Sequence, residues 1–145
     1  NLMNLSRQWR DESGDYGILA TRTIQRYLGG KAVEPTLSGL SIVSVRHPDE
    51  ARRIKEADGK IFWIDADPKL RYERIQTGGR NRVDDQKSFE EFVDEEQREI
   101  YPVSANPASV NLGAVSRIAD VKIENNFDDE SAYVDFLLDQ YFSEG

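Results

Sequence analysis

The sequence contains no cysteine and a single histidine, His47, among its 145 residues. Without cysteine, the chain cannot form disulfide bonds, thiolate metal sites or a cysteine nucleophile. One histidine also excludes sites that need several histidine ligands, and it makes a Ser-His-Asp triad a poor explanation of any activity. We therefore expect no metal site built from the side chains of this chain.

The sequence also lacks long hydrophobic runs. No stretch approaches the roughly 18 apolar residues that a membrane-spanning helix needs. No basic segment followed by an apolar segment, as in a secretory leader, opens the chain. These absences predict a cytoplasmic protein with no membrane partner.

The length and composition fit one folded domain spanning 1–145. Hydrophobic residues make up 38% of the chain, which is enough to build a core. The 19 Lys and Arg residues and the 27 Asp and Glu residues give a formal charge of −8. This balance argues against a nonspecific binder of nucleic-acid polymers, because such binders need a positive face. It leaves the oligomeric state open.

Positive charge is concentrated in one segment of this acidic chain. Residues 69–82 include one acidic residue and five basic ones, Lys69, Arg71, Arg74, Arg80 and Arg82. In contrast, 84–99 is strongly acidic, and 123–145 contains no basic residue. A local arginine cluster in an acidic protein indicates a small anionic ligand, not a polymer.

Hydrophobic spacing and turn residues predict an α/β protein with a parallel sheet. We expect strands at 41–45, 60–65 and 121–123. We expect helices over much of 1–30, ending at Gly29-Gly30, and at 48–57, 68–77, 88–101 and 113–118, with a last helix capped by Asp128. Strands that alternate with helices indicate parallel pairing through right-handed crossovers.

The phosphate-binding loops that are common in such folds are missing from this sequence. Gly30-Lys31 and Gly59-Lys60 lack the spacing and the Ser or Thr of the G-x-x-x-x-G-K-[ST] motif. No G-x-G-x-x-G motif is present either.

The strongest motif is R-Y-E-R-I-Q-T-G-G-R-N-R-V-D-D at 71–85. Spaced arginines beside glycines and paired aspartates suit a mobile phosphate lid, about 78–87. The arginines can neutralise transferring charge, and the aspartates can hold an arginine while the lid is open. The same residues could also form a solvated helix face followed by a surface turn.

With this motif, 41–142 resembles the later part of a P-loop nucleotide kinase, of the nucleoside-monophosphate kinase and dephospho-CoA kinase-like group. The matching features come in the family order. They are a strand, a D-x-x-P-x-x-R-x-x-R helix, the Gly-Arg lid, an acidic S-F-E-E-F-x-x-x-E helix, and A-D-x-x-I-x-N before a final helix. The resemblance implies a three-layer fold, a parallel sheet with flanking helices.

The resemblance also implies roles for individual residues. Arg80 and Arg82 match catalytic lid arginines that contact the ATP phosphates and the transferring group, and Asp84 and Asp85 match lid-ordering aspartates. Arg74 and Asn125 match positions near ATP, the latter acting largely through its backbone. Arg46 and Arg22 match arginines that bind the acceptor.

Two departures from the family pattern matter. Ser44-Val45 stands where many relatives carry an aspartate that supports Mg²⁺, and the phosphate loop would have to precede Asn1. We therefore expect a C-terminal portion of an ATP- and Mg²⁺-dependent phosphotransferase that is inactive alone. Its acceptor would be a nucleoside monophosphate, dephospho-CoA or a related small alcohol. The alternative is a non-catalytic nucleotide-binding or interaction module with a decayed kinase fold.

Overall fold

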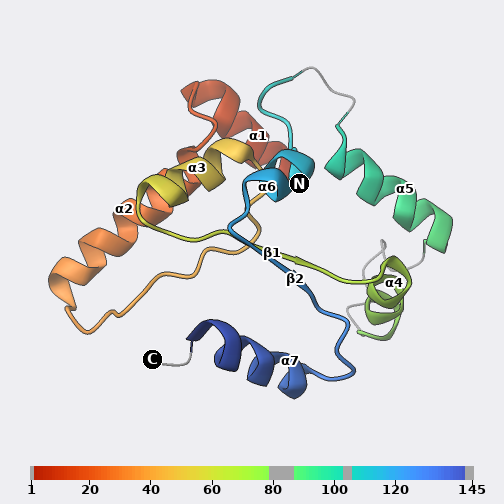
Figure 1. The fold of residues 1–145 in the computed structure, drawn as a ribbon. Coiled ribbons are helices and arrows are strands. Elements are labelled where there is room, and N and C mark those ends of the chain that lie inside the picture. The colour runs from red at the N-terminus through yellow and green to blue at the C-terminus, as the bar shows by residue number, and fades with distance from the viewer. Residues whose placement is uncertain (1, 79–86, 103–105, 143–145) are drawn as a thin grey trace.

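The computed structural model describes residues 2–78, 87–102 and 106–142. It confirms the α/β class (Figure 1). The elements in chain order are α1 (Leu2–Ser13), α2 (Ile18–Val33), α3 (Pro48–Glu56), β1 (Phe62–Asp65), α4 (Pro68–Thr77), α5 (Phe89–Ile100), α6 (Leu112–Ile118), β2 (Val121–Glu124), α7 (Glu130–Leu137) and the π-helical turn η2 (Leu138–Phe142).

The two strands pair in parallel, as predicted, with Phe62 opposite Val121 and Asp65 opposite Glu124. In the described part of the chain between these strands, there are three helices, α4, α5 and α6. Because the strands are parallel and in register, their carboxyl ends meet at the same edge of the sheet. The segments that follow each strand therefore start next to each other.

Helices lie on both sides of the strands. In Figure 1, α3 and α6 lie above β1 and β2, and α7 lies below them. On the first side, Ile54 of α3 and Val115 of α6 form the buried core with Ile61, Ala20 and Ala51. On the second side, rings of the C-terminal turn pack against Phe62 of β1.

Capping side chains define most helix starts where the sequence predicted them. The Asp67 carboxylate accepts hydrogen bonds from the backbone N–H groups of Lys69 and Leu70, directly before Pro68. Ser88 and Glu91 form a reciprocal capping box at the start of α5. The last helix begins one residue later than predicted, because Asp129, not Asp128, accepts the hydrogen bond from Ala132 N–H.

The predicted strand at 41–45 is wrong, since the structure has no regular element there. Ser44 adopts a left-handed conformation with φ of 61°, which interrupts an extended run. Val43 is 80% exposed, while Ile42 and Val45 pack partly against the core. The segment instead connects α2 to α3 and is held by the packing of Ile42 and Val45. Within the described residues, no neighbouring strand pairs with it.

Residues 2–33 are mostly helical, as predicted, and form two helices with a break between Ser13 and Ile18. Gly14 follows α1 with φ of 65°, a conformation that glycine adopts without strain. The second helix passes through Gly29-Gly30, the predicted end, and continues to Val33. Along the described parts of the chain, none of the helices combines the length and apolarity required to cross a membrane.

The packing of α6 against the end of α5 depends on the lack of a side chain at Gly113. A methyl group there would lie 2.4 Å from the backbone carbonyl oxygen of Ile100, which cannot rotate away. We expect Gly113→Ala to lower the free energy of unfolding by about 1–3 kcal/mol. Urea unfolding would measure this loss.

Gly29→Ala is the matched control, because nothing lies within 4 Å of the position that a Cβ would take at Gly29 in α2. That substitution is expected to stabilise the protein by up to about 1 kcal/mol through helix propensity. Equal unfolding midpoints for the two variants would contradict the packing described for α5 and α6.

Candidate functional site

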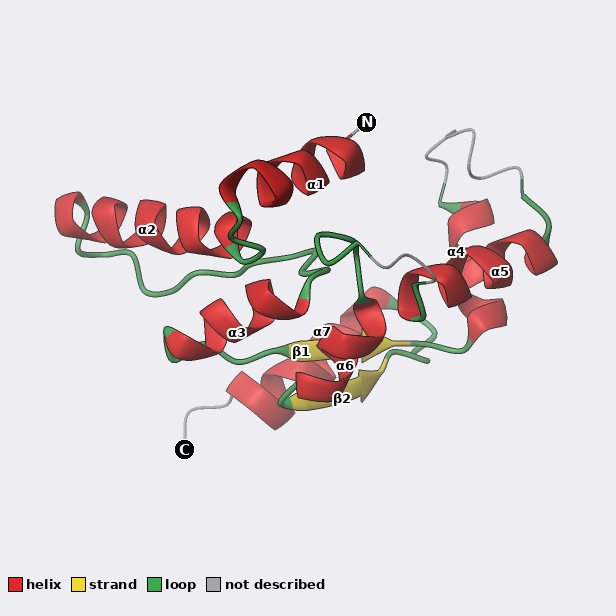
Figure 2. Ribbon diagram, turned by 90° about the horizontal axis from the view of Figure 1, so that it is seen from above, coloured by secondary structure: helices red, strands yellow, loops and turns green. Residues whose placement is uncertain are grey.

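Polar side chains gather at the carboxyl ends of the two parallel strands. Asp65 ends β1 and Glu124 ends β2, and the segments beyond them lead to α4 and α7 (Figure 2). Open α/β sheets bind ligands at this edge, where the chain leaves the strands. The residues here are therefore the first candidates for a binding site.

Arg74 joins the helix α4 to the segment after β2. Its guanidinium donates hydrogen bonds to the backbone carbonyl oxygens of Asn125 at 2.8 Å and of Phe127 at 2.6 Å. The structure thus brings together Arg74 and Asn125, the two residues predicted to lie near ATP. Both contacts go through the backbone of the loop, so Arg74 determines the course of residues 125–127.

Asn126 adds a side-chain contact across the same edge. Its Oδ1 accepts a hydrogen bond from the backbone N–H of Asp67 at 2.8 Å. Its Nδ2 donates to Glu124 at 3.3 Å. Asn126 therefore joins the loop after β2 to the turn before α4, and Arg74 joins the same loop to α4 itself.

Arg71 is an ion-pairing residue to which the sequence analysis assigned no separate role. It contacts the carboxylate of Asp65, the carbonyl oxygen of Ala66, and both carboxylate oxygens of Glu96, the last two at 3.0 and 2.5 Å. Burial disfavours its charge, but the hydrogen bonds to Glu96 and the nearby aspartates outweigh this and raise the pKa of Arg71. Arg71 remains charged and ties α5 to the end of β1.

Arg46, the predicted acceptor-binding arginine, lies one position before the capping residue of α3. Its Nη1 donates to both carboxylate oxygens of Glu99, at 3.3 Å each. The Arg46 and Glu99 side chains are 40% and 39% exposed. Glu96 and Glu99, one helical turn apart on α5, thus pair with arginines from two other segments.

The remaining predicted residues lie elsewhere. Arg22 is exposed on α2, where its guanidinium lies over Trp9 of α1, 5.1 Å from the ring centre. The four lid residues Arg80, Arg82, Asp84 and Asp85 fall within 79–86, outside the described residues.

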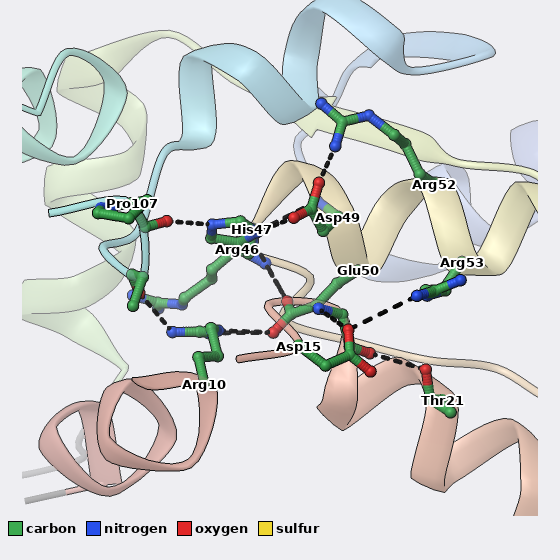
Figure 3. A network of polar contacts seen from close by, with 12 residues as sticks. Arg10, Asp15, Thr21, Arg46, His47, Asp49, Glu50, Arg52, Arg53 and Pro107 are labelled. Carbon is green, nitrogen blue, oxygen red and sulfur yellow. Dashed lines mark hydrogen bonds and ion pairs between the residues drawn. The ribbon is translucent and has the colours of Figure 1, made fainter. Parts of the chain in front are cut away.

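A buried network holds the backbone around Arg46 (Figure 3). Glu50 of α3 is 4% exposed, and its Oε2 accepts hydrogen bonds from the backbone N–H groups of Arg46 at 3.1 Å and His47 at 3.2 Å. Its Oε1 accepts from Arg10 of α1 at 3.0 and 3.2 Å. Arg10, 2% exposed, also donates to the carbonyl oxygen of Ala108 at 3.1 Å.

His47 completes this network as the N-terminal cap of α3. Its Nδ1 accepts the hydrogen bond of Asp49 N–H at 3.1 Å, so the proton of the neutral ring lies on Nε2. That Nε2 donates to the carbonyl oxygen of Pro107 at 2.7 Å. His47 is therefore held as a helix cap through both of its ring nitrogens.

The arrangement suits the recognition of an anion better than acid–base chemistry. Arg71 and Arg74 of α4 lie at the carboxyl edge, where carboxylates and carbonyl oxygens hold them, and Arg46 is held by Glu99 of α5. Among residues 2–78, 87–102 and 106–142, no group of carboxylates or histidines is placed to hold a metal ion. The described carboxylates Asp65, Glu96 and Glu99 instead serve as partners of arginines.

Comparison with known proteins gives relatives but no activity. No family model matches the chain, and no solved structure matches it significantly. A UPF0200 protein of Methanococcus maripaludis is 33% identical over 85 residues, 59% of this chain and 39% of the relative. UPF0200 proteins of Pyrococcus furiosus and Pyrococcus horikoshii are 28% and 31% identical, over 144 and 129 residues.

These matches differ in extent. The match to the Pyrococcus furiosus protein covers 97% of this chain and 72% of that protein. The match to the Pyrococcus horikoshii protein covers 86% of this chain and 62% of that protein. The chain spans about two fifths of the length of the Methanococcus relatives that it matches. It is therefore similar to UPF0200 proteins, whose names state no reaction.

The His47 network predicts a pH dependence of stability. Burial, together with the charges of Arg10 and Arg52, lowers the pKa of His47 below 6.5, although the Pro107 carbonyl and Glu50 act in the opposite direction. The unfolded chain then binds a proton at higher pH than the folded chain. We expect His47 to contribute stability above pH 6.5 that is lost as the pH falls through its lowered pKa.

Urea unfolding of the wild type and His47→Asn between about pH 8 and pH 5 would measure this. Asparagine also caps helices but does not titrate, and His47 is the only histidine of the chain. The difference in stability between the two proteins should shrink on acidification. A constant difference over the whole range would rule out the neutral cap.

Proposed function

We propose that the intact protein is an ATP-dependent phosphotransferase that acts on a nucleotide or nucleoside-like acceptor. The observation that carries the proposal is the convergence of arginines at the carboxyl edge of a parallel strand pair. Arg71 and Arg74 come from the helix after β1, and Arg46 is linked to Arg71 through Glu99 and Glu96 of α5. Phosphoryl transfer depends mostly on positioning and on neutralising charge, which arginines supply.

The fold supports a three-layer arrangement like that of P-loop kinases. The parallel register of β1 and β2, the helical crossover between them, and helices on both sides of the strands agree with it. The resemblance of the sequence adds the order of motifs. We place the protein in the cytoplasm on the sequence features given above.

In this proposal, Arg80 and Arg82 contact the phosphates of ATP, and Asp84 and Asp85 order the lid. Arg74 shapes the loop at 125–127 that passes the adenine. Arg46 binds the acceptor phosphate, and Arg22 is a candidate for the acceptor through the resemblance alone. Among the described residues, no group of three or more Asp, Glu or His side chains is placed to hold a metal ion, and Mg²⁺ has no assigned ligand in this proposal.

A non-catalytic nucleotide-binding module is the second candidate. It is favoured by the engagement of Arg46 with Glu99 and of Arg74 with two carbonyl oxygens, which leaves these guanidinium groups held by the protein. Such a module would bind nucleotides through the same edge without transferring phosphate.

Substitution of the two lid arginines distinguishes these candidates. In the full-length protein, Arg80→Ala and Arg82→Ala are each expected to lower the rate of phosphoryl transfer from ATP by about 10²–10³-fold, because each removes charge stabilisation. A panel of nucleoside monophosphates and dephospho-CoA serves as acceptors. Arg117→Ala, a charge removal on α6, is the control and should retain the rate.

Undiminished turnover in both variants would refute the lid assignment. Nucleotide binding without transfer to any acceptor of the panel by the wild type would support the non-catalytic module instead.

The pair between Arg46 and Glu99 gives a further prediction. An anion that binds Arg46 must compete with the Glu99 carboxylate, and exposed pairs of this kind are weak. Glu99→Gln should therefore tighten the binding of inorganic phosphate at Arg46 by about two- to fivefold. The Nε–H signal of Arg46 in a nitrogen-15 NMR spectrum, followed during a phosphate titration, measures this affinity.

Glu90→Gln is the control, because Glu90 lies exposed on the same helix and its substitution changes the net charge equally. A similar gain in both variants would mean that only the net charge of α5 matters. No change in Glu99→Gln would remove Glu99 as a competitor for Arg46.

A further inference from the structure

The backbone of Arg46 is held at both of its polar groups. Its N–H donates to the buried carboxylate of Glu50 at 3.1 Å, and its carbonyl oxygen accepts from the N–H of Asn111 at 3.0 Å. The side chain, which is 40% exposed, therefore extends from a fixed backbone toward Glu99 of α5. A binding side chain on a fixed backbone loses little conformational freedom when a ligand binds.

The charge of Glu50 is compensated inside the network. Glu50 and Arg10 have side chains that are only 5% and 3% exposed, and the two groups form a direct ion pair. An uncompensated buried carboxylate close to Arg46 would attract its guanidinium and compete with a ligand anion. Arg10 removes this competition while it leaves Glu50 Oε2 available to the backbone N–H groups of Arg46 and His47.

Arg10 comes from a distant part of the chain. It connects α1 to the start of α3 and, through the carbonyl oxygen of Ala108, to the segment before α6. The position of the Arg46 backbone thus depends on three parts of the molecule that meet at one ion pair. Figure 3 shows Arg10, Glu50 and Arg46 converging in this way.

We propose that the buried pair of Arg10 and Glu50 is a positioning device for Arg46, which gives Arg46 the fixed backbone that binding of a phosphate monoester requires. Glu50 holds the backbone N–H, and Arg10 neutralises Glu50 so that the anion site keeps its positive charge. Neither residue contacts the ligand. The inference rests on the proposed role of Arg46 as an anion-binding residue.

Two double variants of the full-length protein test this. The first, the acceptor-retaining variant, combines Arg10→Met with Glu50→Gln, and its new amide oxygen can still accept from Arg46 N–H. The second, the acceptor-free variant, combines Arg10→Met with Glu50→Met and has no such acceptor. Both remove the buried charges and largely keep the side-chain volume, a replacement that buried ion pairs often tolerate.

The probe is inorganic phosphate, and the readout is its dissociation constant from the Arg46 Nε–H signal. Circular dichroism melting establishes a temperature at which both variants are folded, and binding is compared there. We expect the acceptor-retaining variant to bind within about twofold of the wild type and the acceptor-free variant to bind about tenfold more weakly, because small misplacements of a binding group are costly. Hydrogen exchange of the Arg46 backbone amide should be accelerated only in the acceptor-free variant.

Asp120→Asn is a control for stability alone. Asp120 accepts hydrogen bonds from the Lys55 ammonium group and from Ile61 N–H, both outside the Arg46 network. This variant should melt at a lower temperature with an unchanged dissociation constant.

Equal affinities in the two double variants would overturn the positioning role while leaving Arg46 as an anion site. An Arg46 Nε–H signal that does not shift when phosphate is added to the wild type would instead refute the anion site, and the proposed function would lose its acceptor arginine. The two failures are therefore distinguishable.

Discussion

The arrangement of the N-terminal half depends on the contacts that the buried carboxylate of Glu50 makes. One buried side chain accepts hydrogen bonds from Arg10 and from the backbone N–H groups of Arg46 and His47. Burying a carboxylate is costly unless it is paired and well hydrogen-bonded, and here both conditions are met. Because its partners come from α1 and from the turn before α3, the pair fixes how these elements lie against each other.

Local features of the fold could be predicted from the sequence, because they depend on neighbouring residues. Asp67 before Pro68 and Ser88 three residues before Glu91 define helix starts through contacts within one turn. The absence of a strand at 41–45 could not be predicted, because a β-branched run becomes a strand only when another strand pairs with it. The left-handed backbone of Ser44 is also set by its surroundings and not by its residue type.

In the candidate site, too, some contacts could be predicted from the sequence and others could not. The resemblance to nucleotide kinases implies positions near ATP for both Arg74 and Asn125. The structure brings the two residues into direct contact, while their role toward ATP stays a prediction. The pairing of Arg71 with Glu96 and of Arg46 with Glu99 could not be predicted, because it depends on how α5 packs beside the strand ends. The many acidic residues of α5 are typical of a solvated surface. In the structure, two of them supply the negative charge that balances arginines of other segments.

The hydrogen bonds of Arg74 have a mechanical consequence. The planar guanidinium of Arg74 donates to two carbonyl oxygens, and this double contact resists both rotation and separation of α4 and residues 125–127. The two segments therefore move together as one unit. Asn126 adds a second point of attachment at the other end of α4. Any tilt of α4 would therefore carry the loop after β2 with it, and a motion that begins at the end of α4 would reach the C-terminal helix through the backbone.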